Sequence, residues 1–149
     1  MQFAAVRAAI ADAARAVTLP AGAAKLTSTG YTPDSVSAPH FFVGEYTVDY
    51  DKTFGRGRDE AEFTARVLVG RQDDRAAQLI LDAMLSGAGP ASLKQAIEAA
   101  RGAPGQAALG GLADDLRVER VQGYRWYEHA GTQYVGAEII IRVIGDGRT

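Results

Sequence analysis

Apolar side chains recur along this chain at two spacings, and the change from one to the other marks its elements. Residues 2–17 place apolar side chains at helical spacing and their charges elsewhere. This pattern predicts an amphipathic helix that ends before Pro20. We expect a short strand around residues 24–28 and a turn at residues 30–34, where glycine and proline occur together.

Two strands joined by a polar tip are predicted next. Residues 40–50 carry bulky side chains on both faces, so this strand is expected to be covered on two sides. Residues 63–69 alternate at period two, which predicts a second strand. The glycine-rich segment 51–59 would then be the tip of a long hairpin.

Helical spacing returns in residues 72–86, with Asp73 and Asp74 expected in the first turn, where the helix dipole favours negative charge. A shorter helix of about residues 93–100 follows a serine–glutamine capping box. Residues 101–113 are rich in glycine and small residues, and we expect a mobile loop there.

A second hairpin is predicted in the C-terminal third. Residues 116–127 lead to a turn at Gly131, and residues 135–143 alternate strongly. The order is α-β-β-β-α-α-β-β. Grouped strands with interrupting helices predict one α+β domain over residues 1–149, with a mostly antiparallel sheet and two long hairpins packed by the N-terminal helix and one or two central helices.

Composition limits the classes of function. A length of 149 residues and a hydrophobic fraction of 47% suit one domain with a packed core, and a net charge of −2 argues against bulk nucleic acid or an anionic membrane as the main partner. Without cysteine there can be no disulfide, thiolate nucleophile or cysteine-ligated zinc. Charges interrupt the apolar N-terminus, so neither a signal peptide nor a membrane span is expected.

Titratable residues offer two candidate sites. His40 and His129 are distant in sequence and lack a second histidine at ligand spacing, so we interpret them as a strand-end and a turn residue. Carboxylates gather around the predicted tip, but a calcium-loop spacing is absent and arginines lie between them. Internal ion pairs in a solvated tip are therefore the expected explanation, and no metal ligand is assigned. The carboxylates are Asp49, Asp51, Asp59, Glu60 and Glu62.

Catalytic motifs are not recognisable in the sequence. The segment 55–57, Gly-Arg-Gly, joins two predicted strands, whereas a phosphate-binding loop joins a strand to a helix. No serine lies in a Gly-x-Ser-x-Gly setting, and no triad can be assembled. The adjacent Asp114 and Asp115 are expected to diverge and to act as caps. We therefore predict a protein that is not an enzyme and needs no cofactor.

The densest aromatic cluster is formed by Tyr124, Trp126 and Tyr127. Such residues serve either as strand core or as interface anchors. Because neighbouring residues of a strand point to opposite faces, Trp126 and Tyr127 cannot share one core.

Several segments, in the same order and spacing over nearly the whole chain, resemble the tail terminator (tail completion) proteins of long-tailed actinobacterial phages and prophages. Loop 101–113 departs from that pattern. The segments are Tyr31 to Val36 with Pro39, Tyr50 to Glu60, Val67 to Arg71, Asp74 to Gln78, Leu81 to Asp82, Leu85 to Gly87, Ser92 to Glu98 and Leu116 to Val118.

The resemblance implies a structural virion protein. Such proteins form a homohexameric ring that caps the head-proximal end of the tail tube, stops tube polymerisation and provides the surface for joining tail to head. The implied partners are other copies of the chain, the tail tube protein and a neck or head-completion protein. Assembly would take place in the host cytoplasm, no membrane is involved, and the genome would pass through the lumen without specific binding.

Two segments are the candidate contact elements. The tip could order against the tube or a neighbouring subunit, with its arginines forming bidentate pairs. The aromatic cluster could anchor the seam between subunits. The interface candidates are Phe54, Arg56, Arg58, Asp59, Glu60, Tyr124, Trp126 and Tyr127.

Three alternatives remain open from sequence. A neck or head-completion (connector) protein belongs to the same morphogenetic class. A small nucleic-acid-binding module would use Arg56, Arg58 and the aromatic residues, and its binding would weaken with salt. An enzyme would bind a metal ion at the acidic tip, and a divalent ion would raise its melting temperature.

Overall fold

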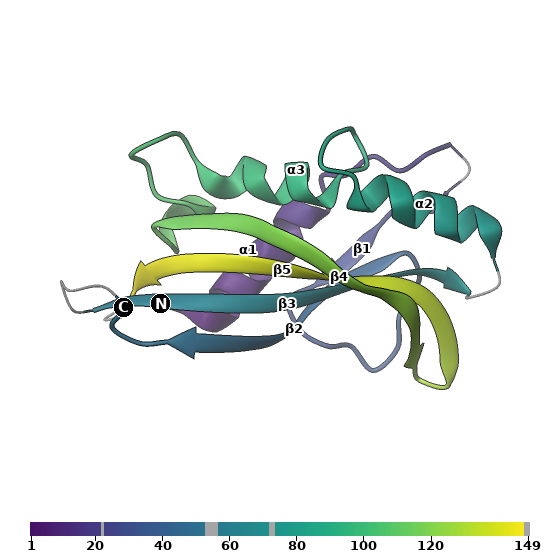
Figure 1. Ribbon diagram of the computed structural model, residues 1–149, viewed down its shortest axis with the longest axis horizontal. Coiled ribbons are helices and arrows are strands. Elements are labelled where there is room, and N and C mark those ends of the chain that lie inside the picture. Colours follow the sequence, from purple (N-terminus) through teal and green to yellow (C-terminus); the bar gives the residue numbers. More distant parts are fainter. Residues whose placement is uncertain (22, 53–56, 72–73, 148–149) are drawn as a thin grey trace.

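The structure is a computed structural model that describes residues 1–21, 23–52, 57–71 and 74–147. Within these residues, three α-helices pack on one face of a five-stranded sheet with the strand order β1-β2-β3-β5-β4 (Figure 1). The fold is α+β, in the element order that the sequence predicts. The elements are α1 (Phe3–Ala14), β1 (Thr27–Thr29), β2 (His40–Asp49), β3 (Arg58–Arg71), α2 (Arg75–Leu85), α3 (Leu93–Glu98), β4 (Asp115–His129) and β5 (Thr132–Asp146).

The sheet is antiparallel except at one border. β2 pairs with β3, β3 with β5, and β5 with β4, all antiparallel, whereas the three-residue β1 lies parallel to the start of β2. Both predicted hairpins are present, and the β4–β5 hairpin curves away from the helices at its turn (Figure 1). β2 and β4 are therefore the long strands nearest the two edges of the sheet.

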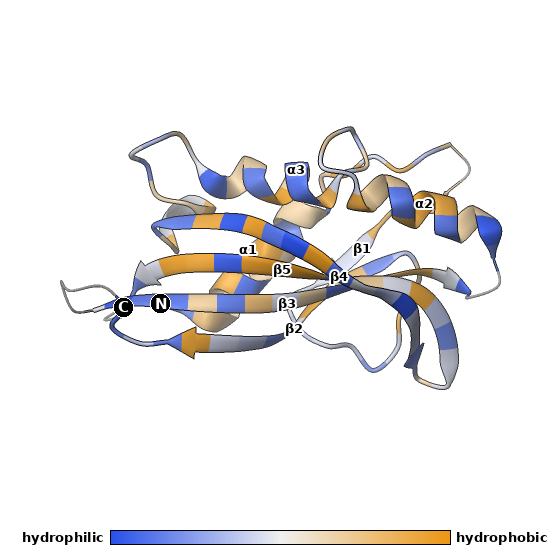
Figure 2. Cartoon of the chain, in the orientation of Figure 1, coloured by the Kyte–Doolittle hydropathy of each residue, from blue (hydrophilic) through white to orange (hydrophobic). Residues whose placement is uncertain are grey.

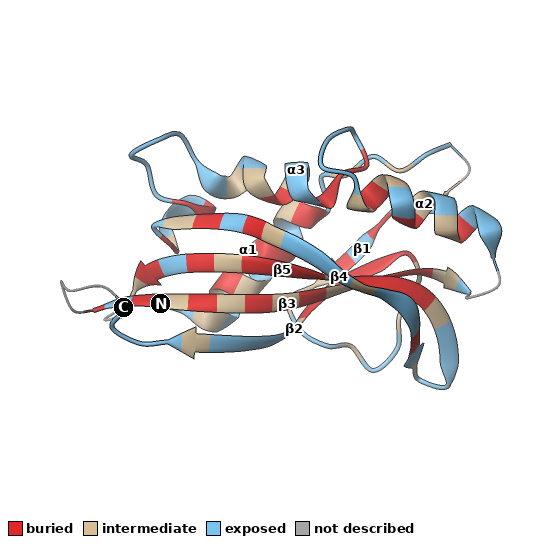
Figure 3. Cartoon of the chain, viewed as in Figure 1, coloured by how far each residue is buried: buried red, intermediate tan, exposed pale blue. Residues whose placement is uncertain are grey.

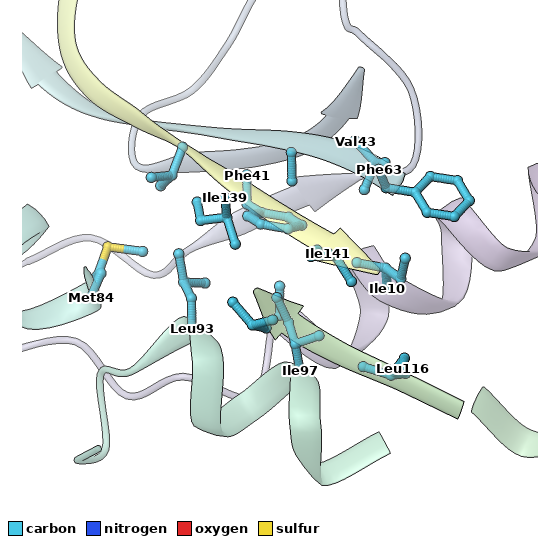
Figure 4. Close-up of a cluster of buried hydrophobic side chains, with 14 of the residues drawn as sticks. Ile10, Phe41, Val43, Phe63, Met84, Leu93, Ile97, Leu116, Ile139 and Ile141 are labelled. Atoms are coloured by element: carbon cyan, nitrogen blue, oxygen red, sulfur yellow. The ribbon is translucent and has the colours of Figure 1, made fainter. Parts of the chain in front are cut away.

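The core lies between the sheet and the three helices. Figure 4 shows side chains from both layers meeting there, and β5 is apolar along much of its length (Figure 2). Alternate residues of β3 are buried along most of its length because every second side chain points toward the helices, whereas central β5 also buries Gly136 and Ile140 on the opposite face. The labelled members are Ile10, Phe41, Val43, Phe63, Met84, Leu93, Ile97, Leu116, Ile139 and Ile141.

The opposite face of the sheet carries charged side chains in ladders. Arg142 on β5 forms ion pairs with Glu60 and Glu62 of β3 and with Glu119 of β4. These residues make the ends of the strands look polar in sequence, because at this end of the sheet they lie on the face away from the helices. β3 begins at Arg58, which pairs with Asp146 of β5. The strand therefore includes residues that the sequence assigned to the tip.

Helix termini confirm part of the capping prediction. The Ser92 hydroxyl accepts a hydrogen bond from the Gln95 backbone N–H at 3.2 Å, but the Gln95 amide oxygen accepts from Gly89 N–H rather than closing the box. Asp74 is the N-cap of α2 and accepts from Ala76 N–H at 2.9 Å, so its expected place in the first turn was wrong by one position. Its predicted companion, residue 73, lies outside the described residues.

Three other local expectations differ from the structure. Loop 101–113 returns to the core in its second half, where Ala108 and Ala113 form an isolated bridge and Leu109 is buried. The strand expected at residues 24–28 lies at Thr27–Thr29, where it can pair with β2. β2 is covered on both faces only over its first half, and from Glu45 onward it is largely exposed.

Candidate interaction surface

The outer half of β4 exposes apolar side chains along an edge of the sheet (Figure 3). Trp126 is 64% exposed, Tyr124 47% and Val121 40%. Val121 and Trp126 lie opposite Ile139 and Val135, two core residues of β5, so both side chains are on the helix side of the sheet. Single exposed apolar residues are ordinary, but a row of them on an edge strand indicates a contact surface.

Tyr124 lies near the neighbouring helix. Burial raises the pKa of the Tyr124 phenol, and the nearby Asp82 carboxylate of α2 raises it further. Leu79 lies one turn before Asp82 on α2 and is 62% exposed. The phenol therefore stays neutral at physiological pH.

Tyr127 faces the other way, as the sequence predicts. It is buried in a small cluster with Phe42 and Leu68 on the far face of the sheet. The Arg66 guanidinium lies 4.3 Å from its ring centroid, and its hydroxyl donates to the Gly123 carbonyl. Burial raises the pKa of the phenol, with the Glu138 carboxylate as a second cause. Tyr127 thus fixes the strand and is not available as an interface anchor in the folded monomer.

Gly123 lies at a bulge in β4 and leaves room for the Tyr127 hydroxyl. The register of β4 against β5 shifts between Gln122 and Arg125, and Gly123 has φ +65°. A Cβ atom at Gly123 would lie 2.5 Å from the Tyr127 hydroxyl oxygen. A larger residue at Gly123 would therefore meet both backbone strain and a clash. The bulge was not foreseen, and the glycine before the aromatic cluster was its only signal in the sequence.

Hydrogen bonds from backbone N–H groups to two carboxylates close the base of the tip. The Asp59 carboxylate is buried and accepts from the Asp51 N–H at 3.1 Å, while the Asp51 carboxylate accepts from the Gly57 N–H at 2.7 Å. Asp51 has φ +51°, a left-handed conformation that aspartate tolerates in turns. These carboxylates therefore hold the turn together through hydrogen bonds within the chain.

The other described tip candidates also have partners within the chain. Arg58 pairs with Asp114 at 2.9 Å, and Glu60 pairs with Arg142. Asp115 instead pairs with Arg101 at 2.7 Å, so the adjacent aspartates diverge as expected. Both form ion pairs, where the sequence predicted caps. The remaining tip candidates, residues 54 and 56, lie outside the described residues. Described residues hold no group of three metal-ligating side chains that could bind an ion.

The two histidines, distant in sequence, meet around one ring. The Phe42 ring centroid lies 6.0 Å from that of His40 and 5.8 Å from that of His129. His40 is hydrogen-bonded to the Thr27 hydroxyl at 2.6 Å, and His129 Nε2 is within 2.7 Å of the Pro33 carbonyl oxygen. Burial lowers the pKa of His40, and the neighbouring His129 and Arg15 lower it further. This arrangement ties β1 and the β4–β5 hairpin to β2.

Stability is expected to fall when the pH drops below about 6.5, the usual pKa of histidine in an unfolded chain. Because the folded state holds the pKa of His40 below that value, the unfolded state binds a proton first and is favoured as pH falls toward the folded pKa. Urea unfolding at pH 7.5 and pH 5.5 measures this loss, and His40→Asn should make it smaller. An equal loss in the variant would contradict the assignment. The carboxylates whose pKa is lowered, Glu98, Asp115 and Glu138, act at more acidic pH.

No protein-family model matches the sequence, and no curated protein matches it at a significant level. Among the described helices, none combines the length and apolar character needed to cross a membrane.

Proposed function

We propose that this chain is a structural assembly subunit that caps the head-proximal end of a phage tail tube as a ring. The resemblance described above supplies the place and the partners. The observation that carries the proposal is the row of exposed apolar side chains on the outer half of β4, which the chain leaves in solvent. Exposed strand edges with apolar side chains recruit further chains.

The physical basis of termination is a difference between two surfaces. A growing tube presents the same surface after each added ring. A terminator binds that surface on one side and presents a different one on the other, so no further tube ring can be added. Rings of identical subunits form through head-to-tail interfaces that close on themselves.

Binding of a small substrate has weaker support in the described residues. A depression of about 800 Å³ is lined by residues 101–107 together with Asp114 and Asp115. Its charged groups already have partners, because Arg101 binds Asp115 through two hydrogen bonds and Asp114 pairs with Arg58. These contacts stabilise the loop and leave little unpaired polarity for a ligand.

The test is electron microscopy of the purified protein alone and after mixing with purified tail tubes. The proposal expects rings, and density of the chain at one end of each tube. A tube protein polymerised with the chain present should give shorter tubes than without it. Rings that bind only an isolated portal or connector would instead favour the neck protein. A monomer that leaves tube length unchanged would refute the proposed function.

A further inference from the structure

Each edge of the sheet is closed along one half and open along the other. β1 covers β2 at His40–Phe42, and from Val43 to Asp49 the pairing within the described chain is with β3 alone. On β4, the N–H of Val118 donates to the Glu98 carboxylate at 2.9 Å. This contact closes the start of β4, and the open half of β4 runs from Glu119 to His129.

The open half of β2 is acidic on the face away from the helices. Glu45 lies opposite Thr64 on β3, and Asp49 lies opposite Glu60, so both carboxylates share the charged face of the sheet. Both side chains are exposed. On the helix side, Tyr46 lies opposite Phe63 and is 41% exposed.

The open half of β4 has the complementary pattern. Arg120 lies opposite Ile140 and Arg125 opposite Gly136, and both guanidinium groups are on the charged face. The ion pairs of Arg120 within the chain are long, at 3.6 Å to Glu119 and 3.8 Å to Glu62. The helix side of the same segment carries the apolar row Val121, Tyr124 and Trp126.

Strand direction allows these two edges to join. Three successive antiparallel pairings separate β2 from β4, so the two strands run in opposite directions within one chain. A second copy placed beside the first in the same orientation brings its β2 antiparallel to the first copy's β4. The helix sides then coincide. Through Glu60 and Ile144, Asp49 lies level with Asp115, so the second copy must also be displaced along the strands by about five residues. This displacement sets Asp49 and Glu45 opposite Arg120 and Arg125, and brings Tyr46 beside the apolar row.

Twofold arrangements lack this match. A twofold axis perpendicular to the sheet would pair β4 with the β4 of the other copy, and would place Arg120 and Arg125 beside the same arginines. It could instead pair β2 with β2, and would then place Glu45 and Asp49 beside the same carboxylates. Like charges placed across an interface cost several kcal/mol. An axis parallel to the strands would turn one sheet over, and would set the arginines against the apolar row.

We propose that the open half of β4 in one copy pairs antiparallel with the open half of β2 in the next copy. This interface is the seam of the assembly described under the proposed function, and it rests on that function because it requires the chain to associate with itself. It adds backbone hydrogen bonds for affinity and alternating side-chain contacts for register. Head-to-tail repetition closes into a ring when the rotation between copies allows it.

Charge reversal tests the seam. The variant R120E/R125E makes both open edges acidic, and E45R/D49R makes both basic. Each variant alone is expected to associate at least about 100-fold more weakly than the wild type, because every junction then opposes like charges. Mixed in equal amounts, the two variants should assemble again, since each acidic β4 meets a basic β2 and each basic β4 an acidic β2. Native mass spectrometry should find equal numbers of both in each ring.

Matched controls separate folding from assembly. The variant R75E/K25E makes the same charge change at exposed positions outside the open halves of β2 and β4, and should assemble as the wild type does. Melting temperatures check each fold, and the single variants R120E and E45R replace a double variant that unfolds.

Assembly of either folded variant at wild-type strength, or no recovery on mixing, would overturn the seam and leave ring capping intact. A wild-type chain that stays monomeric and does not cap tubes would overturn both proposals.

Discussion

Replacement of Phe63 by alanine is expected to lower the free energy of unfolding by about 3–5 kcal/mol. Phe63 lies at the middle of β3, between Tyr46 of β2 and Ile141 of β5, and its side chain is fully buried. Its ring centroid is 5.3 Å from that of Tyr46. The substitution removes a large side chain from the core between the sheet and the helices and leaves a cavity that the surrounding strands cannot fill, because their ladders fix their separation.

Chemical denaturation followed by circular dichroism measures this loss. Phe63→Leu keeps most of the volume and should cost markedly less, whereas Tyr31→Ala, at a position that is 61% exposed, should change stability by less than about 0.5 kcal/mol. A loss below about 1 kcal/mol for Phe63→Ala would show that this part of the core is not packed as described.

The element order was predictable because each element carries its own period. β5 alternates through Ile139 and Ile141, and α2 repeats Ala77, Leu81 and Met84 toward the core. Those patterns depend only on which side of one element is buried. The α+β class and the two hairpins follow from them, since short connections between neighbouring strands produce antiparallel pairs.

Strand ends were not predictable from period alone. Glu60 and Glu62 look like parts of a solvated tip, yet they lie in β3 paired with β5, where Arg142 forms ion pairs with both. That partner is 80 or more residues away in sequence. A local pattern cannot show which charges a distant strand will neutralise, so the predicted tip was too long at its C-terminal side.

The candidate site residues were predictable only in part, because some of their contacts also depend on distant strands. The opposite orientation of Trp126 and Tyr127 follows from strand geometry and is confirmed. The partners of Tyr127 could not be predicted, because they come from β2 and β3 through the fold. The meeting of His40 and His129 around Phe42 likewise depends on the sheet order, which brings the end of the last hairpin beside the start of β2.

Trp126→Ala is expected to weaken self-association by about 2 kcal/mol, or about 30-fold, while leaving the fold intact. The indole is 64% exposed and lies on the helix side of the open half of β4, so the monomer loses little packing without it. A large aromatic side chain at the centre of an interface is the usual site of such an effect. Tyr124→Ala should have a smaller effect, because Tyr124 is less exposed in the monomer, at 47%.

The wild-type chain reports on the same contact without substitution. Trp126 is the single tryptophan, so its fluorescence monitors one position. As protein concentration rises, burial of the indole between copies should shift the emission to shorter wavelength in parallel with the mass measured by sedimentation. Tyr31→Ala is the matched control for Trp126→Ala and should associate as the wild type does. Tyr31 is about as exposed as Trp126 but lies outside the open halves of β2 and β4. Rings that form with unchanged tryptophan emission would place the seam elsewhere, because an indole in this row cannot stay hydrated while a neighbouring strand pairs with β4.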